Sequence, residues 1–154
     1  MKILINILLI IFAIILQIAF LPLVSIHGAY PNILLIVILS LLFIGRVNES
    51  LWWVGIGGLL IELFSTLHFG VYIISFIIIF LLFYYFINHI FSDPSLVSAA
   101  FLFFVASLML NIVFVIITHY YFTYLVEAIY TAVVGCMIYI LIKYYYRPVD
   151  EVKI

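Results

Sequence analysis

Charged side chains are scarce in this sequence. Only 7% of its 154 residues are Asp, Glu, Lys or Arg, whereas 71% are hydrophobic. A soluble domain is about one quarter charged. A chain of this length cannot bury such an apolar excess in a water-soluble core, so lipid must surround most of its surface. The sequence therefore predicts an all-α integral membrane protein, because a helix satisfies its own backbone hydrogen bonds in lipid.

Cysteine and basic clusters are also nearly missing. Cys136 is the only cysteine, which excludes an internal disulfide and any CxxC metal or redox motif. The net charge of −1 and the lack of a basic run argue against a nucleic-acid partner. The four histidines are isolated from one another, and no phosphate-binding glycine motif is present. We therefore expect no catalytic site, no metal and no cofactor.

Long apolar runs separated by helix breakers make up nearly the whole chain. The first run is longer than the 7–15 apolar residues of a signal peptide and lacks a small-residue cleavage site, so we expect it to be retained. The runs predict a bundle of about six transmembrane helices in a single domain, 1–147, with a short tail, 148–154. Their bounds are Ile3 to Leu21, Ile33 to Ile44, Leu51 to Phe64, Val71 to Phe91, Ser95 to Thr118 and Tyr124 to Tyr145.

The second and third runs are shorter than the roughly 20 residues that a span needs. They either borrow flanking residues or form a re-entrant hairpin buried by neighbouring helices. The distribution of charge favours full spans, because six spans place every basic residue on one side. The positive-inside rule then puts both termini in the cytoplasm. The basic residues are Lys2, Arg46, Lys143, Arg147 and Lys153.

The third run combines glycines with an acidic residue. Five of its residues lie three or four positions apart and are predicted to share one helical face: Trp52, Gly55, Gly58, Glu62 and Ser65. The glycines indicate close helix packing, or else the lining of a cavity. Glu62 is either a functional carboxylate or a buried structural one, with Ser65 and His68 as its nearest partners along the chain.

Three further polar residues interrupt apolar runs. Gln17 and Asn111 are expected to form interhelical hydrogen bonds, and Glu127 is expected to sit at the start of the last helix, where the helix dipole favours an acid. In the six-span topology these residues share the outer half of the bilayer with Glu62. We therefore predict an outward-facing polar pocket or docking surface.

The order of motifs in the first half of the chain resembles the rod shape-determining MreD family. Leu16-Gln17 closes the first run, and Pro31-Asn32-Ile-Leu-Leu opens the second. The stretch Gly55-Ile-Gly57-Gly58-Leu-Leu-Ile-Glu62-Leu-Phe-Ser65 is similar to the family's Gly-x-x-Gly-Gly-Leu-x-x-Asp-x-x-Ser. Glu62 departs from the family, which usually has Asp there. The last two runs match the family only in hydropathy.

The resemblance implies a non-enzymatic scaffold of the bacterial cell-elongation machinery, which synthesises peptidoglycan. Its expected partners are the single-span protein MreC, the actin-like MreB, RodA and a class B penicillin-binding protein. The alternative is a solute-binding membrane subunit of an ECF-type vitamin importer, which is also a six-helix bundle with an outward pocket. The first run lacks the alanine-rich coupling motif expected of such a subunit.

Overall fold

Helices account for nearly all of the described structure. The computed structural model describes residues 2–65, 70–89, 95–118 and 124–146. Within these residues there is no strand, only an isolated bridge between Ile26 and Ala29. The helices are α1 (Lys2–Ile15) with a π turn (Leu16–Phe20) and a 3-10 turn (Leu21–Val24), α2 (Ile33–Phe43), α3 (Val47–Trp52), a π turn (Trp53–Gly57), α4 (Gly58–Phe64), α5 (Val71–His89), α6 (Leu96–Thr118) and α7 (Tyr124–Tyr145).

The predicted breakers end or begin the helices as expected. Pro22 lies in the 3-10 turn after α1, where its missing amide hydrogen prevents regular α-helical bonding. Asn32 caps α2, accepting a hydrogen bond from the Leu35 amide at 3.0 Å. Gly45 ends the same helix with φ +83°, a conformation that suits glycine. The all-helical class predicted from composition is confirmed.

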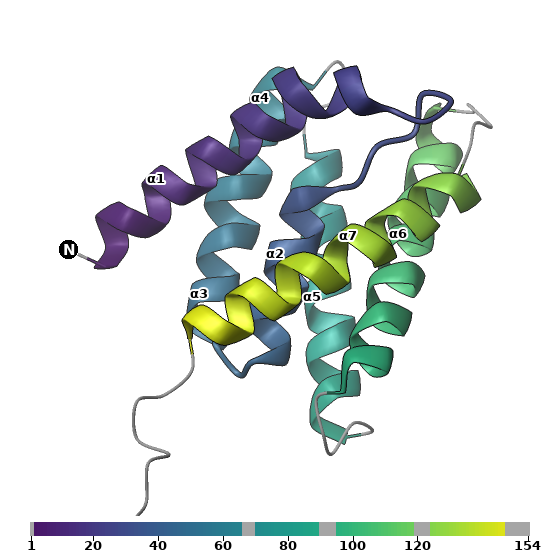
Figure 1. Ribbon diagram of the computed structural model, residues 1–154. Coiled ribbons are helices and arrows are strands. Elements are labelled where there is room, and N and C mark those ends of the chain that lie inside the picture. Colours follow the sequence, from purple (N-terminus) through teal and green to yellow (C-terminus); the bar gives the residue numbers. More distant parts are fainter. Residues whose placement is uncertain (1, 66–69, 90–94, 119–123, 147–154) are drawn as a thin grey trace, which may run out of the picture.

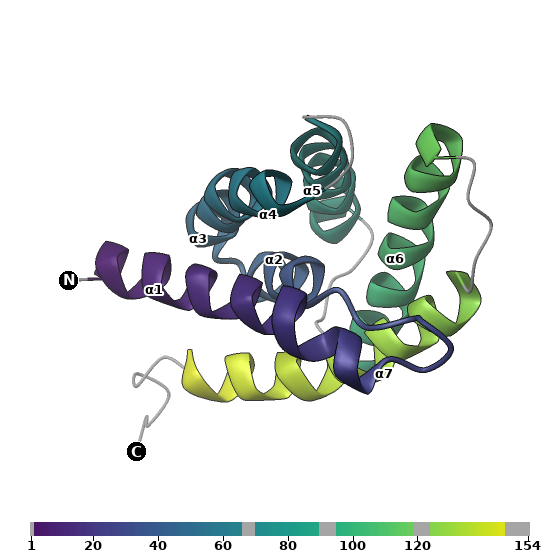
Figure 2. The same cartoon turned by 90° about the horizontal axis from the view of Figure 1, so that it is seen from above.

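The short helix α2 is the centre of the bundle. All of its residues from Leu34 to Phe43 are buried. In two views it lies among the other helices, with α1 and α7 crossing it obliquely (Figures 1 and 2). A helix covered on every side needs no polar face, which explains why its sequence has no amphipathic pattern.

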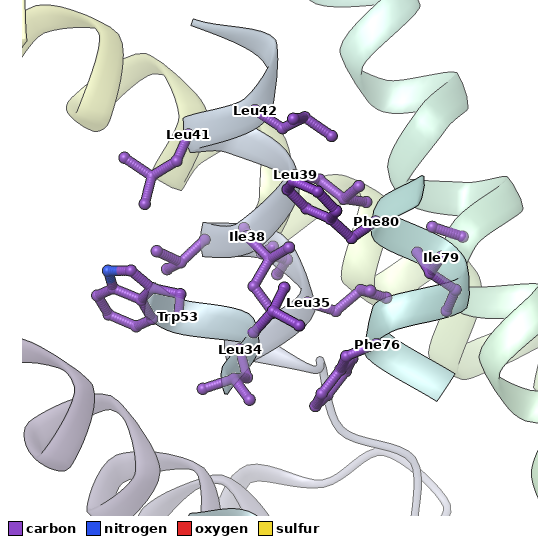
Figure 3. Packing of buried hydrophobic residues seen from close by; sticks show 14 of the residues in the cluster. Leu34, Leu35, Ile38, Leu39, Leu41, Leu42, Trp53, Phe76, Ile79 and Phe80 are labelled. Carbon is purple, nitrogen blue, oxygen red and sulfur yellow. The ribbon is translucent and has the colours of Figure 1, made fainter. Parts of the chain in front are cut away.

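The core forms where α2 packs against α5 and against the π turn that begins at Trp53. Figure 3 shows Trp53 on one side of α2, near Ile38, and Phe76, Ile79 and Phe80 of α5 on the other. A hydrogen bond also links α3 to α2, because the Ser50 hydroxyl donates to the Ile38 carbonyl at 2.8 Å. These contacts hold the second and third predicted segments together as a hairpin.

Four stretches of the described chain are long and apolar enough to cross a membrane: Leu4–Val24, Val71–His89, Leu96–Ile116 and Tyr124–Tyr145. Their composition and length mark a membrane protein. In contrast, α2 has 11 residues and is about 16 Å long at 1.5 Å per residue, against a hydrocarbon core of about 30 Å. The full count of six spans therefore stays a prediction.

The single helical face predicted for the third segment is wrong. Trp52 and Gly55 are exposed, whereas Gly58 and Glu62 are buried. The cause is the π turn at Trp53–Gly57. A π turn inserts about one extra residue, which rotates the residues before it by about 100° relative to those after it. The two ends of the segment therefore point in different directions.

The glycines of this segment consequently have different surroundings. A Cβ atom on Gly57 would lie 2.9 Å from Leu34 Cδ1, and one on Gly58 would lie 2.9 Å from Ile73 Cγ1. A Cβ on Gly55 would meet nothing within 4 Å. Gly57 and Gly58 thus allow close packing against α2 and α5, as the packing interpretation expected, and Gly55 stays open.

Candidate functional site

A chain of buried hydrogen bonds joins the end of the first helix to the start of α2. Gln17, in the π turn after α1, donates from Nε2 to Asn32 Oδ1 at 3.3 Å. Its Oε1 atom accepts from the Leu34 amide at 3.1 Å. Both polar ends of the Gln17 side chain are therefore used, and the interhelical bonding expected of this residue is confirmed.

The same cluster reaches the last helix through Asn32. The Asn32 backbone amide donates to Thr131 Oγ1 on α7 at 3.3 Å. Asn32 and Thr131 are both buried. We call Gln17, Asn32 and Thr131 the junction cluster, because it ties three segments together that are distant in sequence. In an apolar interior such bonds favour one alignment of the helices, since misalignment would leave buried polar groups unpaired.

Glu62, in α4, binds the start of α5. Its Oε2 atom accepts hydrogen bonds from the amides of Tyr72 at 2.9 Å and Ile73 at 3.2 Å. These are free amides in the first turn of α5, where the helix dipole also favours a negative charge. Glu62 is 3% exposed, and its Oε1 atom has no hydrogen-bond partner among the described residues. A buried acid is thus bound to backbone donors that need an acceptor.

Asn111 and Glu127 face each other across α6 and α7. Their side chains lie close enough to interact. Asn111 is buried, and its Nδ2 atom makes no well-formed hydrogen bond to the part of the chain that the structure describes.

A small polar pocket opens beside Glu62. It has a volume of about 240 Å³ and is lined by Gln17, Ile18, Tyr30, Ile61, Phe64, Ser65 and Tyr72. The side chains of Ser65 and Tyr72 are hydrogen-bonded to each other. Burial, and then the charge of Glu127, raises the pKa of Tyr30 above its usual value of 10.0. Tyr30 is therefore an uncharged hydroxyl at neutral pH, and Glu127 lies within electrostatic range of it.

The structure brings five of the predicted site residues to one end of the bundle: Gln17, Glu62, Ser65, Asn111 and Glu127. Trp52 and Gly55 lie elsewhere, on the open side of the third segment, and Gly58 packs inside the bundle. His68 lies outside the described residues.

The site predicted from the sequence did not include four members of this end: Tyr30, Asn32, Tyr72 and Thr131. Asn32 had a usable signal, because an asparagine just before an apolar run is a typical helix cap. Thr131 shares a helical face with Glu127 at i+4. The two tyrosines gave no such signal, because tyrosine is common at both membrane interfaces.

An open apolar groove lies on the other side of the third segment. It has a volume of about 730 Å³. Gly55 forms part of it, Trp52 and Leu59 flank Gly55 along the segment, and Ile73 contributes from α5. Asn48 is its only lining residue with a polar side chain other than the indole of Trp52.

The opposite end of the bundle carries basic residues. Arg46 forms an ion pair with Glu49 and lies 4.1 Å from the centre of the Tyr146 ring. These contacts join the turn between α2 and α3 to the end of α7. Burial, together with the hydrogen bond that the Tyr146 hydroxyl donates to Glu49 and the negative charge of Glu49, raises the pKa of Tyr146 to about 12.

Comparison of this chain with protein-family models, with curated proteins and with solved structures finds no match.

Proposed function

We propose that this protein is a multi-pass scaffold of the bacterial cytoplasmic membrane, in the cell-elongation machinery, as its resemblance to the MreD family implies. The observation that carries the proposal is the role of the family-like motif in the bundle. Gly58 allows α4 to pack on α5, and Glu62 caps the first turn of α5. A motif that serves to pack two helices together fits a protein that works by binding partners rather than by catalysis.

The distribution of basic residues supports an orientation with both termini in the cytoplasm. The start of α1, the turn between α2 and α3 and the end of α7 lie toward the same side of the bundle (Figures 1 and 2). Arg46 and Lys143 belong to these parts. An excess of Lys and Arg is typical of the cytoplasmic side.

We propose that the apolar groove at Gly55 receives the single membrane-spanning helix of an MreC-like partner. A glycine with open space beside it lets another helix approach closely. Trp52 and Leu59 supply large apolar surfaces on either side of Gly55. The polar pocket is a poorer basis for the importer alternative, because about 240 Å³ is below the 300–1,000 Å³ usual for drug-sized ligands.

The test is co-purification with MreC, together with rescue of rod shape in cells depleted of their own MreD. Gly55→Leu should fill the groove without a clash, so the protein should accumulate normally but lose most of its bound MreC. Val133→Leu is the matched control, because Val133 is exposed on α7, away from the groove.

Gly58→Leu separates packing from docking. Its side chain would collide with Ile73, and overpacking of this kind costs about 1–3 kcal/mol. We expect lower accumulation of this variant in the membrane. Failure of the wild-type protein both to bind MreC and to rescue rod shape would refute the proposed function. Normal binding by Gly55→Leu would refute only the groove as the docking site.

A further inference from the structure

The polar pocket has walls of two kinds. Gln17, Tyr30, Ser65 and Tyr72 provide amide and hydroxyl groups, and Ile18, Ile61 and Phe64 provide apolar surface. Ile18 and Phe64 are 41% and 67% exposed, so the apolar side of the pocket continues onto the outer surface of the bundle. The pocket is therefore suited to a ligand with a polar head and an apolar remainder.

The surroundings of the pocket favour positive charge. Glu62 lies next to the pocket, because its carboxylate accepts hydrogen bonds from the amides of Tyr72 and Ile73, and Glu127 lies within electrostatic range of Tyr30 and Tyr72. The sequence contains no Lys or Arg between residues 3 and 45 or between residues 47 and 142, the two ranges that supply every wall of the pocket. Two carboxyl groups in a part of the chain that has no Lys or Arg attract a cation.

The aromatic walls fit a particular class of cation. Tyr30 and Tyr72 lie within electrostatic range of each other and both line the pocket. The faces of aromatic rings attract alkylammonium groups, and this attraction is strongest where water is excluded. The volume of about 240 Å³ corresponds to roughly eight water molecules, which suits a headgroup rather than a larger solute.

We propose that this pocket binds an alkylammonium group, held between Tyr30 and Tyr72 beside Glu62 and Glu127. The group can belong to the headgroup of an amine-bearing lipid, whose acyl chains would follow Ile18 and Phe64, or to a small free amine. The inference is independent of the scaffold function, since it rests on the pocket and not on the groove at Gly55.

The test uses the purified full-length protein and native mass spectrometry with two lipids of identical acyl chains. Phosphatidylethanolamine carries an ammonium group and phosphatidylglycerol does not. We expect the wild-type protein to retain phosphatidylethanolamine about tenfold more than phosphatidylglycerol, in line with a desolvated cation–π contact. Displacement by free ethanolamine would identify the amine as sufficient, and resistance to it would identify the lipid as the ligand.

Variants locate the preference in the pocket. Tyr30→Ala removes a ring from a loop, and Glu127→Gln removes a charge while preserving shape, so each should bring the two lipids to nearly equal retention. Tyr144→Ala, an exposed tyrosine at the far end of α7, should keep the tenfold preference. Equal retention of both lipids by the wild-type protein overturns the proposal. So does a preference that survives both Tyr30→Ala and Glu127→Gln.

Discussion

The two ends of the bundle use polar side chains in opposite ways. At the end that holds the junction cluster, Gln17, Asn32 and Glu62 are buried and bind backbone or side-chain partners from other segments. At the other end, Arg46 and Glu49 are three residues apart, and the Arg46 side chain is 39% exposed. The first arrangement is buried, whereas the second is partly exposed to solvent.

This difference shows which polar groups determine the alignment of the helices. Losing one partner of a buried hydrogen bond leaves the other unsatisfied in a medium without water, which is costly. Losing an exposed ion pair costs little, because solvent replaces it. We therefore expect substitutions at the junction end to destabilise the bundle far more than substitutions at the basic end.

Glu62→Leu should have the largest effect. It removes the acceptor of two amides at the start of α5, for a loss of about 3 kcal/mol in the free energy of unfolding. Glu62→Gln retains an acceptor oxygen and should lose about 1 kcal/mol. Unfolding in mixed detergent micelles, followed by circular dichroism, measures both. Equal losses for the two variants would show that the charge, and not hydrogen bonding to α5, is what matters.

Asn32→Ala should have the next largest effect, about 2 kcal/mol, because it removes the cap of α2 and the acceptor for Gln17. The same unfolding assay applies. Asn48→Ala is the matched control, since Asn48 is exposed at the basic end. A loss as large for Asn48→Ala as for Asn32→Ala would break the contrast between the two ends.

Arg46→Gln should change stability by less than about 1 kcal/mol, because its ion pair and ring contact are partly exposed. High salt should weaken the wild-type ion pair, so the difference between wild type and variant should shrink further. A loss above that of Asn32→Ala would mean that the basic end also determines the packing of α7.

Alkaline pH should affect the basic end through Tyr146. Its pKa is raised from 10.0 to about 12 in the folded protein, so between these values the unfolded chain releases a proton that the folded chain keeps. Stability must then fall as the pH rises through this window. Wild type should lose slightly more stability than Tyr146→Phe, as measured by unfolding at each pH. An identical pH dependence of the two proteins would contradict the raised pKa.

Much of the helical layout was predictable, because breakers and apolar runs are local features. The predicted last helix matches α7 at both ends, and α2 differs from its prediction by one residue. The convergence of Gln17, Glu62 and Glu127 was anticipated from a shared depth in the bilayer. The hydrogen-bond partners at this end of the bundle were harder to predict, because they come from distant parts of the chain. Asn32, for example, donates to a threonine 99 residues away.

The π turn at Trp53–Gly57 shows where sequence reasoning fails. An assumed α-helical period places Gly55, Gly58 and Glu62 on one face, but the extra residue in the turn separates them. Such a turn depends on how the helix packs against its neighbours. Here Gly57 must fit against Leu34, and Gly58 against Ile73.

The sequence by itself determined that the protein is helical, that it contains apolar stretches long enough to cross a membrane, and where most of its helices begin and end. These features follow from hydropathy, breakers and charge, which act locally or through the solvent. Only the tertiary structure decided that α2 is enclosed, that Glu62 binds the amides of α5 and that a polar pocket forms beside it. Each depends on contacts between segments far apart in the chain, and local sequence patterns do not specify such contacts.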